Sequence, residues 1–247
     1  MKALILAAGY AVRLYPLTKE MPKSLLPVQD KPIIDYIVAK LRALEEIREI
    51  IVVTNSKFIS QFQRWRNTIK DARNIRLVDD LTKCYRARRG AVGDIGFVID
   101  KEHIKDDLLV IGGDNLFDAD LKDFLSFART KDGSVVGVYN IKDKRRANKF
   151  GVLKLDGNNR IVDFKEKPKN PESTLVAMCL YYFPKNKLGR IKEYLDNNKA
   201  DRHDATGFYI DWLRQKEAVY GFVFSGRWHD IGSHQFYREA KNFKDKN

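Results

Sequence analysis

The stretch LAAGYAVRLYPLTKEMPKSLLPV (residues 6–28) directly follows the first strand-like run of the chain. It holds Gly9, Arg13 and Lys23 in one segment with three prolines, an arrangement that apolar packing does not require. A glycine lets a ligand approach the backbone, and successive N–H groups in such a turn form an anion-binding nest. Arginine and lysine add charges that suit phosphate. The stretch therefore predicts a polyanion site, with a strand-to-helix loop carrying surface charges as the alternative.

The segments around this stretch alternate between strand-like and helix-like patterns. Continuous apolar runs are typical of strands that are buried on both faces, and spacings of three and four residues are typical of amphipathic helices. The strand-like segments are residues 2–7, 49–55, 74–80, 107–117 and 134–140, and the helix-like segments are residues 33–44, 56–69, 91–102 and 121–130. This alternation predicts an α/β fold with a Rossmann-like, doubly wound, mostly parallel sheet.

The pattern changes after about residue 150. A hairpin with the turn DGNN is predicted first, and longer strands and helices follow it. These segments are residues 151–164 (hairpin), 174–183 and 218–226 (strands), and 185–198 and 207–216 (helices). No linker and no internal repeat interrupts the chain. We therefore predict a single domain over residues 1–247, with a nucleotide-binding half (about 1–140) interlocked with a substrate-binding half (about 141–247).

The net charge of the 247-residue chain is +13, which attracts anions. Nucleic acid is one candidate, but the aromatic residues lie in strand-like segments instead of between the basic residues. The densest basic run, KDKRRANK (residues 142–149), is predicted to be a solvated polar loop, with a phosphate or partner contact as the alternative. We therefore expect no nucleic acid partner.

The apolar runs are too short for a membrane helix, which needs roughly 18 residues, and the first residues do not resemble a signal peptide. We therefore expect no membrane partner. Cys84 and Cys179 lie far apart and without metal-ligand spacing. This usage predicts a reduced, cytoplasmic setting.

Two aspartates follow strand-like runs later in the chain. Asp114 comes after a buried run and two glycines, and Asp230 precedes Gly232. Ligands of open α/β sheets bind outside the carboxyl ends of the strands, and Mg²⁺ takes one or two carboxylates together with substrate phosphates. The two aspartates are therefore candidate metal ligands. A helix N-cap is the alternative for each.

Taken together, these segments resemble a family. The stretch at residues 6–28 and the motifs GGDN, FGV, EKP and WHDIG are similar to the signature of the sugar nucleotidyltransferases of the glucose-1-phosphate thymidylyl/uridylyl and mannose-1-phosphate guanylyl types. The resemblance extends from Lys2 to about Tyr237. It implies the nucleotide-diphospho-sugar transferase fold. It also implies Mg²⁺-dependent transfer of a nucleoside monophosphate from an NTP to a sugar-1-phosphate, giving an NDP-sugar and pyrophosphate.

The resemblance implies roles for the matching residues on the nucleotide side. The backbone from Gly9 onward would cradle the triphosphate, Arg13 would bind the β- and γ-phosphates, and Lys23 would lie between the α-phosphate and the acceptor phosphate. Gly90 matches the glycine that faces the nucleobase. The nucleotide-binding residues implied in this way are Ala8, Gly9, Tyr10, Ala11, Arg13 and Gly90.

On the acceptor side, the resemblance implies that Gly151 lies against the sugar, Glu166 accepts hydrogen bonds from its hydroxyls and Lys167 holds its phosphate. Asp114 and Asp230 would hold Mg²⁺, the expected cofactor. The residues implied to be catalytic are Arg13, Lys23 and Asp114.

The chain departs from the family pattern at several positions. Val12 stands in place of Thr or Ser, and Met178 and Cys179 replace a Thr-Gly pair beside the sugar. Both side chains are expected to take up more of the acceptor pocket than Thr-Gly would, and to remove a hydrogen bond to the sugar. The base-reading segment (residues 85–94) lacks the Gln and Pro of the thymidylyl type. Three glycines share one helical face, which predicts either close packing or a slot for the base: Gly90, Gly93 and Gly96.

We expect UTP or dTTP, rather than GTP or CTP, and a sugar-1-phosphate as the substrates. Two alternatives stay open: a weakly active regulatory or binding subunit, and a nucleotidyltransferase that acts on a non-sugar phosphate. The sequence ends about ten residues after Tyr237, without the extra helices of the longer thymidylyl type. We therefore expect a monomer or a homodimer.

Overall fold

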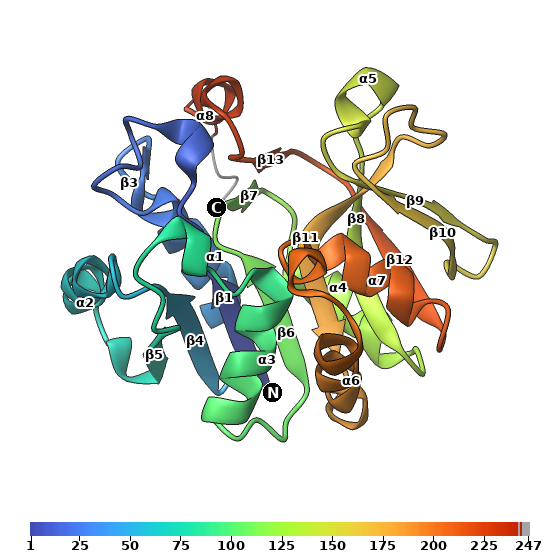
Figure 1. Cartoon of the computed structure of the whole chain (residues 1–247), viewed down its shortest axis with the longest axis horizontal. Helices are drawn as coiled ribbons and strands as arrows, with labels where there is room; N and C mark the ends of the chain where they lie inside the picture. Colours follow the sequence, from blue (N-terminus) through green and yellow to red (C-terminus); the bar gives the residue numbers. More distant parts are fainter. Residues whose placement is uncertain (242, 244–247) are drawn as a thin grey trace.

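A nine-stranded sheet runs through the molecule in the order β10-β9-β11-β6-β1-β4-β5, with β8 paired to β11 and to β12 (Figure 1). The structure is a computed structural model that describes residues 1–241 and 243. The strands of this sheet are β1 (Lys2–Leu6), β4 (Glu49–Thr54), β5 (Ile75–Asp79), β6 (Leu108–Gly112), β8 (Ser134–Asn140), β9 (Gly151–Leu155), β10 (Ile161–Glu166), β11 (Leu175–Phe183) and β12 (Val219–Phe224).

Helices cover both faces of the sheet. The α-helices are α1 (Ile33–Arg42), α2 (Ile59–Thr68), α3 (Ala91–Lys101), α4 (Leu121–Arg129), α5 (Lys144–Ala147), α6 (Gly189–Asn197), α7 (Thr206–Leu213) and α8 (His234–Ala240). The short 3-10 helices are η1 (Val12–Leu14), η2 (Lys23–Leu25), η3 (Ala72–Asn74), η4 (Tyr85–Ala87), η5 (Lys185–Lys187) and η6 (Ala200–His203).

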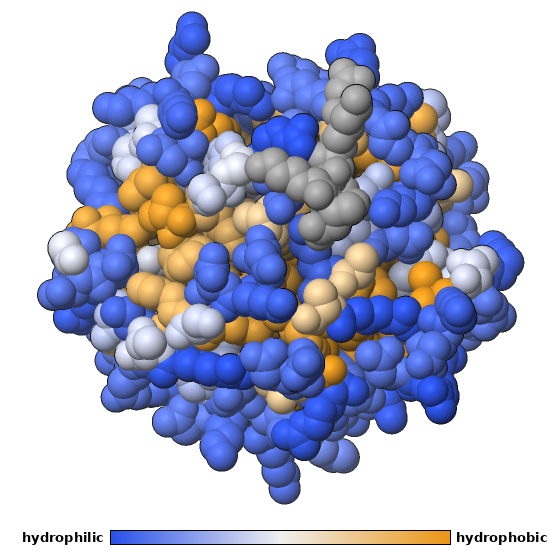
Figure 2. Space-filling model, turned by 180° about the vertical axis from the view of Figure 1, so that it is seen from behind, coloured by the Kyte–Doolittle hydropathy of each residue, from blue (hydrophilic) through white to orange (hydrophobic). Residues whose placement is uncertain are grey.

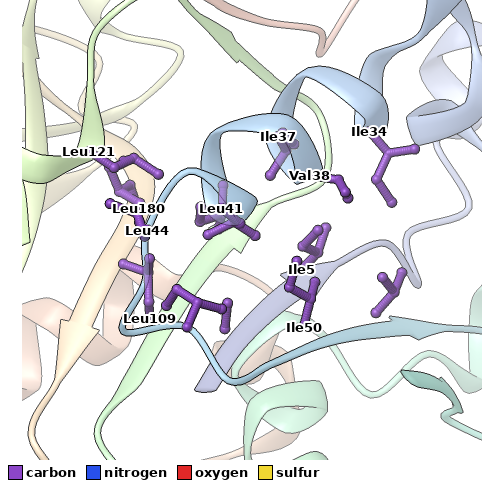
Figure 3. Packing of buried hydrophobic residues seen from close by; sticks show 14 of the residues in the cluster. Ile5, Ile34, Ile37, Val38, Leu41, Leu44, Ile50, Leu109, Leu121 and Leu180 are labelled. Carbon is purple, nitrogen blue, oxygen red and sulfur yellow. The ribbon is translucent and has the colours of Figure 1, made fainter. Parts of the chain in front are cut away.

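Alternate side chains of the central strands enter two separate cores. In β1, Ala3 and Ile5 pack with α1, α2 and α4, whereas Leu4 packs with α3, α6 and α7 on the other face. Figure 3 shows the first of these cores, where Ile5 lies opposite Ile37 and Val38 of α1. Successive residues of a strand point to opposite faces, so a strand buried on both faces needs the continuous apolar runs seen in the sequence.

The sheet has a parallel and an antiparallel region. Strands β5, β4, β1 and β6 pair in parallel, as do β8 and β12. Strand β11 pairs antiparallel with β6, β8 and β9, and the β9–β10 hairpin extends the sheet on the right of Figure 1. The register between β11 and β8 shifts between Ala177 and Tyr181, and Cys179 there has a φ of 53°.

Two short strand pairs lie outside the main sheet. Strand β2 (Pro27–Val28) pairs with β3 (Lys31–Pro32), and β7 (Asn115–Phe117) pairs antiparallel with β13 (Trp228–Asp230). The second pair aligns Asp230 with Asn115, the residue after Asp114. A short ribbon therefore brings residues 228–230 to the carboxyl end of β6.

The predicted fold class is confirmed, and the helices and strands lie within a few residues of their expected ends. The segment at residues 107–117 forms two strands, β6 and β7, separated by a turn at Gly113 and Asp114. One local prediction is corrected. The basic run at residues 142–149 is not only a loop, because it contains the short helix α5, in which Ala147 is fully buried.

The surface seen from behind is mostly hydrophilic, with an apolar area near the middle of that face (Figure 2). Within the part of the chain that the structure describes, every helix is too short or too polar to span a membrane.

Asn55 fixes the loop that leaves β1. Its side chain is fully buried and donates through Nδ2 to the carbonyl of Ala8 at 2.8 Å, while its Oδ1 accepts from the amide of Phe58 at 3.2 Å. The carbonyl of Ala8 would lose this hydrogen bond without the side chain, whereas the amide of Phe58 also donates to the backbone carbonyl of Asn55 at 3.0 Å. Asn55 therefore ties the end of β4 to the start of the Gly9 segment.

We predict that Asn55→Ala lowers the free energy of unfolding by about 1–3 kcal/mol, because it leaves the buried carbonyl of Ala8 without its partner. The control is Asn197→Ala on the exposed side of α6. We expect this variant to change the free energy of unfolding by less than about 0.5 kcal/mol. Chemical denaturation measures both. Equal effects would contradict the role of Asn55.

Candidate active site

Two cavities meet at the carboxyl ends of the parallel strands. The α3 cavity, of about 190 Å³, lies between the end of β1 and the start of α3. The α7 cavity, of about 230 Å³, lies between β9, β10, β11 and the start of α7. Four residues border both cavities: Ala91, Asp114, Cys179 and Asp204. A ligand in one cavity would therefore be next to a ligand in the other.

Three charged side chains gather where the cavities meet. Lys23, at the start of η2, forms an ion pair with Oδ2 of Asp114, and each side chain is 20% exposed. Asp230 is brought beside them by the β7–β13 ribbon. The indole of Trp228 donates to Oδ1 of Asn115 at 2.6 Å and holds the two strands of that ribbon together. The group combines residues from three distant parts of the sequence.

The charges of this group depend on each other. Burial alone lowers the pKa of Lys23, but the carboxylates of Asp114 and Asp230 outweigh burial, and the net shift is upward. Burial alone raises the pKa of Asp114, whereas the Lys23 ammonium lowers it, and the net shift is downward. Burial and then repulsion by Asp114 raise the pKa of Asp230 to about 7. Lys23 therefore stays charged, and the second carboxylate lacks a full counter-charge.

A cation would supply this missing charge. The carboxyl group of Asp114 acts directly on that of Asp230, so the two lie close together and one ion can reach both. Among residues 1–241 and 243, no group of three or more His, Cys, Asp or Glu side chains could hold a metal. The two carboxylates would therefore need ligand oxygens to complete a coordination shell, as Mg²⁺ accepts from phosphates. Neither aspartate caps a helix, since Asp120 caps α4 and Ser233 caps α8.

The Gly9 segment lies beside this group. Ala8 and Gly9 border the α3 cavity, and a Cβ added to Gly9 would meet no atom within 4 Å. Tyr10 points away, because its buried ring packs on Phe58. The open space at Gly9 is available to a ligand, so nothing within the chain itself requires a glycine there.

Arg13 reaches the same region from η1. Its guanidinium Nη2 lies 4.0 Å from where a Cβ on Gly232 would be, and its charge acts on both Lys23 and Asp230. Ala11, which precedes η1 with a φ of 47°, does not border either cavity. Of the residues predicted in this stretch, the structure thus brings Ala8, Gly9, Arg13 and Lys23 to the site, whereas the side chains of Tyr10 and Ala11 lie away from it.

Glu166 lines the α7 cavity and lies between Gly151 and Gly207. Its side chain is 9% exposed, and its Oε1 lies 3.2 Å from Nζ of Lys167. A Cβ on Gly151 would lie 3.1 Å from Oε2, and a Cβ on Gly207 would overlap that oxygen. The structure thus brings Gly151, Glu166 and Lys167 together as predicted. Gly207 was missed, because a glycine at the start of a predicted helix does not indicate which side chain it faces.

Gly90 is needed for packing. Its φ is 79°, and a Cβ there would lie 2.5 Å from the carbonyl oxygen of His203. A Cβ on Gly96 would overlap Leu195 of α6. Close packing of α3 therefore explains both glycines. Gly90 also borders the α3 cavity, so its backbone stays accessible to a ligand.

Met178 and Cys179 both border the α7 cavity, and Cys179 borders the α3 cavity as well. The side chain of Met178, however, is 1% exposed and packs in the core on the other face of the sheet, so the expectation that its bulk occupies the acceptor pocket is corrected. Neighbouring residues of a strand point to opposite faces, and the left-handed conformation of Cys179 changes the register locally. Burial, Asp114 and Asp230 raise the pKa of the Cys179 thiol to about 12.

Asp94 is a second residue that the sequence did not single out. It lies in the first turn of α3, borders the α3 cavity and is 6% exposed. Its Oδ1 has no hydrogen-bond partner among the residues that the structure describes. Burial and then the charge of Asp80 raise the pKa of Asp94 to about 8. Asp94 could have been recognised from the sequence, because it is an aspartate on the apolar face of a predicted helix, between Val92 and Ile95.

Comparison with known proteins shows which family the chain belongs to. A family model described as "Nucleotidyl transferase" matches residues 2–247. A glucose-1-phosphate thymidylyltransferase of Xanthomonas campestris pv. campestris is 31% identical over 259 residues, covering 98% of this chain and 80% of the relative. The bifunctional protein GlmU of Methanocaldococcus jannaschii is 29% identical over 235 residues, covering 94% of this chain and 51% of the relative.

The chain thus spans about half the length of the GlmU relatives that it matches. A solved structure of UDP-glucose pyrophosphorylase complexed with UDP-glucose has a TM-score of 0.81 and 23% identity, covering 98% of this chain and 97% of that chain. This structural similarity shows that the two chains share a fold.

The buried carboxyl of Asp94 generates a stability prediction. Its pKa is raised to about 8 in the fold, whereas an unfolded aspartate loses its proton near pH 4. Between these two pKa values, Asp94 is protonated in the folded state and ionised in the unfolded state. The contribution of this proton to the free energy of unfolding is complete below about pH 4 and is lost as the pH rises to about 8. Asp94→Asn removes this dependence.

We therefore predict that Asp94→Asn becomes more stable than the wild type as the pH rises from about 5 to 8, by an amount on the order of a few kcal/mol. Chemical denaturation across this range measures the difference, with Asp100→Asn on the exposed side of α3 as the control. A difference between variant and wild type that is the same at every pH would contradict the raised pKa.

Proposed function

Because the chain belongs to the nucleotidyl transferase family, we propose that it transfers the nucleoside monophosphate of an NTP to a sugar-1-phosphate, giving an NDP-sugar and pyrophosphate. The family resemblance predicted from the sequence is confirmed. The observation that carries the proposal is the Lys23–Asp114–Asp230 group at the junction of the two cavities. A phosphoryl transfer between two anions needs positive charge and fixed geometry at such a junction.

In this proposal the α3 cavity takes the NTP and the α7 cavity takes the acceptor. An oxygen of the acceptor phosphate attacks the α-phosphorus in line, the bond to the β-phosphate breaks, and pyrophosphate leaves with its electron pair. No covalent intermediate with the protein is required. The ammonium of Lys23 lies between the two reactants and lowers their mutual repulsion, while Arg13 holds the outgoing phosphates.

Asp114 and Asp230 are the proposed Mg²⁺ ligands. Two partly buried carboxyl groups that lie close together, one with its pKa raised to about 7, form a donor set that suits a hard divalent cation. Mg²⁺ bound there would withdraw charge from the phosphates. The carboxylates themselves orient Lys23, since its Nζ pairs with Asp114.

Glu166 and Lys167 are the proposed acceptor contacts. The carboxylate of Glu166 is held between Gly151 and Gly207 and has room to accept from sugar hydroxyls. Lys167 borders the same cavity and can pair with the acceptor phosphate. Lys149, part of the basic run predicted to be solvated, also borders this cavity, which favours a phosphate contact for that end of the run.

The finer assignments are also proposals. We propose UTP or dTTP as the donor, a monomer or homodimer as the assembly, and the cytoplasm as the setting. The two cysteines, Cys84 and Cys179, are unpaired, in keeping with that setting.

The proposed function is tested by pyrophosphate release from four NTPs, each with a panel of sugar-1-phosphates, a phosphorylated polyol and a phosphorylated amino alcohol. We predict release with at least one sugar-1-phosphate, and its complete loss when divalent cations are removed by chelation and its return when Mg²⁺ is restored. Release only with a non-sugar phosphate would favour the alternative acceptor. Nucleotide binding without release from any pair would favour a regulatory subunit.

We predict that Lys23→Ala lowers kcat/KM by at least about a hundredfold, because it removes a charge that stabilises the transition state. Lys142→Ala is the matched control, since Lys142 is an exposed lysine, and we expect a change of less than about threefold. Steady-state pyrophosphate release measures both variants. Equal losses in the two variants would exclude the proposed role of Lys23.

We predict that Gly207→Ala raises the KM for the acceptor by about tenfold or more, because the new methyl group displaces the Glu166 carboxylate. Nucleotide affinity should not change. Gly189→Ala in α6 is the control, because a Cβ there meets no atom within 4 Å. The new methyl group in Gly207→Ala would also lie 2.9 Å from the buried ring of Phe164, so thermal unfolding is used to check that both variants are folded. An unchanged acceptor KM in Gly207→Ala would show that Glu166 does not contact the acceptor.

A further inference from the structure

The segment that carries Arg13 (residues 11–20) is held together mainly by its own backbone. In the part of the chain that the structure describes, the backbone hydrogen bonds of this segment stay within it. The amide of Leu14 donates to the carbonyl of Ala11 at 2.9 Å, and the amide of Tyr15 donates to that of Val12 at 3.3 Å. These two bonds close one turn around Arg13. They fix Arg13 relative to its neighbours in the sequence, but not relative to the site.

Side chains from other elements attach the segment to the rest of the molecule. At its far end, Gln61 of α2 donates to the carbonyl of Glu20 at 2.7 Å, and a lysine before α2 contacts the preceding carbonyl. At the Arg13 end the attachment is His234, the first residue of α8, whose Nε2 lies 2.9 Å from the carbonyl oxygen of Tyr15. A carbonyl can only accept, so Nε2 of His234 is the donor.

Apolar packing gives the turn one further point of attachment. Leu14 is 1% exposed and joins the hydrophobic cluster that includes α8. The large side chains of Val12 and Tyr15, however, are 37% and 42% exposed. One buried side chain leaves the turn free to rotate about it, and the hydrogen bond from His234 adds the second point. The direction of the Arg13 side chain therefore depends on His234.

His234 also lies close to Asp230 in the sequence. Strand β13 ends at Asp230, and α8 begins four residues later. A Cβ on Gly232, between them, would lie 3.2 Å from Oδ2 of Asp230 and 4.0 Å from Nη2 of Arg13. His234 itself borders neither the α3 cavity nor the α7 cavity. It can therefore act on a ligand there through the residues that it holds, and not by contact.

A local role in α8 does not explain this side chain. Ser233 caps the helix, because its hydroxyl oxygen accepts from the amide of Phe236 at 3.3 Å. The ring of His234 points instead to a carbonyl that lies 219 residues earlier in the chain. Its hydrogen bond thus joins the segment after β1 to the segment after β13.

We propose that His234 is a positioning residue for the transfer reaction: by holding the carbonyl of Tyr15, it orients the guanidinium of Arg13 toward the departing pyrophosphate. This inference rests on the proposed function, in which Arg13 holds the outgoing phosphates. A guanidinium binds phosphate oxygens as a planar fork, so its orientation matters more than that of a point charge. A displacement of about 1 Å at such a group can lower a rate by about a hundredfold.

The test combines pyrophosphate release with calorimetric binding of pyrophosphate in the presence of Mg²⁺, which needs no turnover. His234→Leu keeps the bulk of the side chain but removes the donor, and we expect it to lower kcat/KM and pyrophosphate affinity by about tenfold or more. His234→Gln should keep both within about threefold of the wild type, because its amide can still donate. The matched control is Gln235→Leu, since Gln235 is an exposed neighbour that reaches Glu239 of the same helix, and it should also stay within about threefold.

The same measurements in an Arg13→Ala background separate positioning from general stabilisation. If His234 acts through Arg13, adding His234→Leu to Arg13→Ala should change either quantity by less than about twofold. Thermal unfolding checks that every variant is folded. His234→Ala, which adds no apolar side chain to the surface, takes the place of His234→Leu if that variant does not fold.

Three results overturn the role of His234: an unchanged pyrophosphate affinity in His234→Leu, an equal loss in His234→Gln, or a loss that multiplies with that of Arg13→Ala. If any of them occurs while pyrophosphate is still released from a substrate pair, the proposed function stands without this role. Pyrophosphate binding that depends non-additively on His234 and Arg13, without release from any substrate pair, supports the role of His234 and overturns the proposed function instead.

Discussion

The ion pair between Lys23 and Asp114 is the contact on which the arrangement of the site depends. It joins the segment after β1 to the turn after β6, and these two strands are direct neighbours in the parallel sheet. Asp230 is added by the β7–β13 ribbon from near the other end of the chain. Without the Lys23 ammonium, two partly buried carboxyl groups would lie close together with no positive side chain between them, which is unfavourable. The pair therefore holds the site in a geometry that a cation and phosphates can complete.

The sheet explains why these charges meet at one place. Strand β6 is central, because it pairs in parallel with β1 and antiparallel with β11. Its carboxyl end therefore borders both the α3 cavity and the α7 cavity. Cys179 of β11, whose backbone has the left-handed conformation, lies at the same point and borders both cavities. A ligand that spans the cavities would pass over the end of β6, so the reacting groups of two substrates would meet beside Asp114.

Much of this could be predicted from the sequence. Apolar runs and helical spacings gave the alternation of strands and helices, because the central strands are buried on both faces and each carries a continuous signal. The order of the motifs around Gly9, Lys23, Asp114 and Asp230 indicated the family and the charge cluster. These predictions succeed because each rests on a local pattern or on a motif whose residues are read directly.

What could not be predicted depends on contacts between distant segments. The overlap of Gly207 with Glu166 requires knowing that α7 packs against β10. The unpartnered oxygen of Asp94 requires knowing that the end of β5 brings Asp80 to α3. Met178 and Cys179 could not be assigned to a face, because the register shift in β11 is set by pairing with β8 and not by the residues themselves.

If Lys23 and Asp230 act on the phosphates as one unit, as proposed, a double-mutant cycle on pyrophosphate release will show that their effects are coupled. The cycle compares kcat/KM for the wild type, Lys23→Ala, Asp230→Asn and the double variant, with Mg²⁺ saturating. Residues that act as a unit are strongly non-additive, so the double variant should lose little more activity than the worse single variant. If the two losses multiply in the double variant, the residues act independently and the account of a single coupled site is wrong.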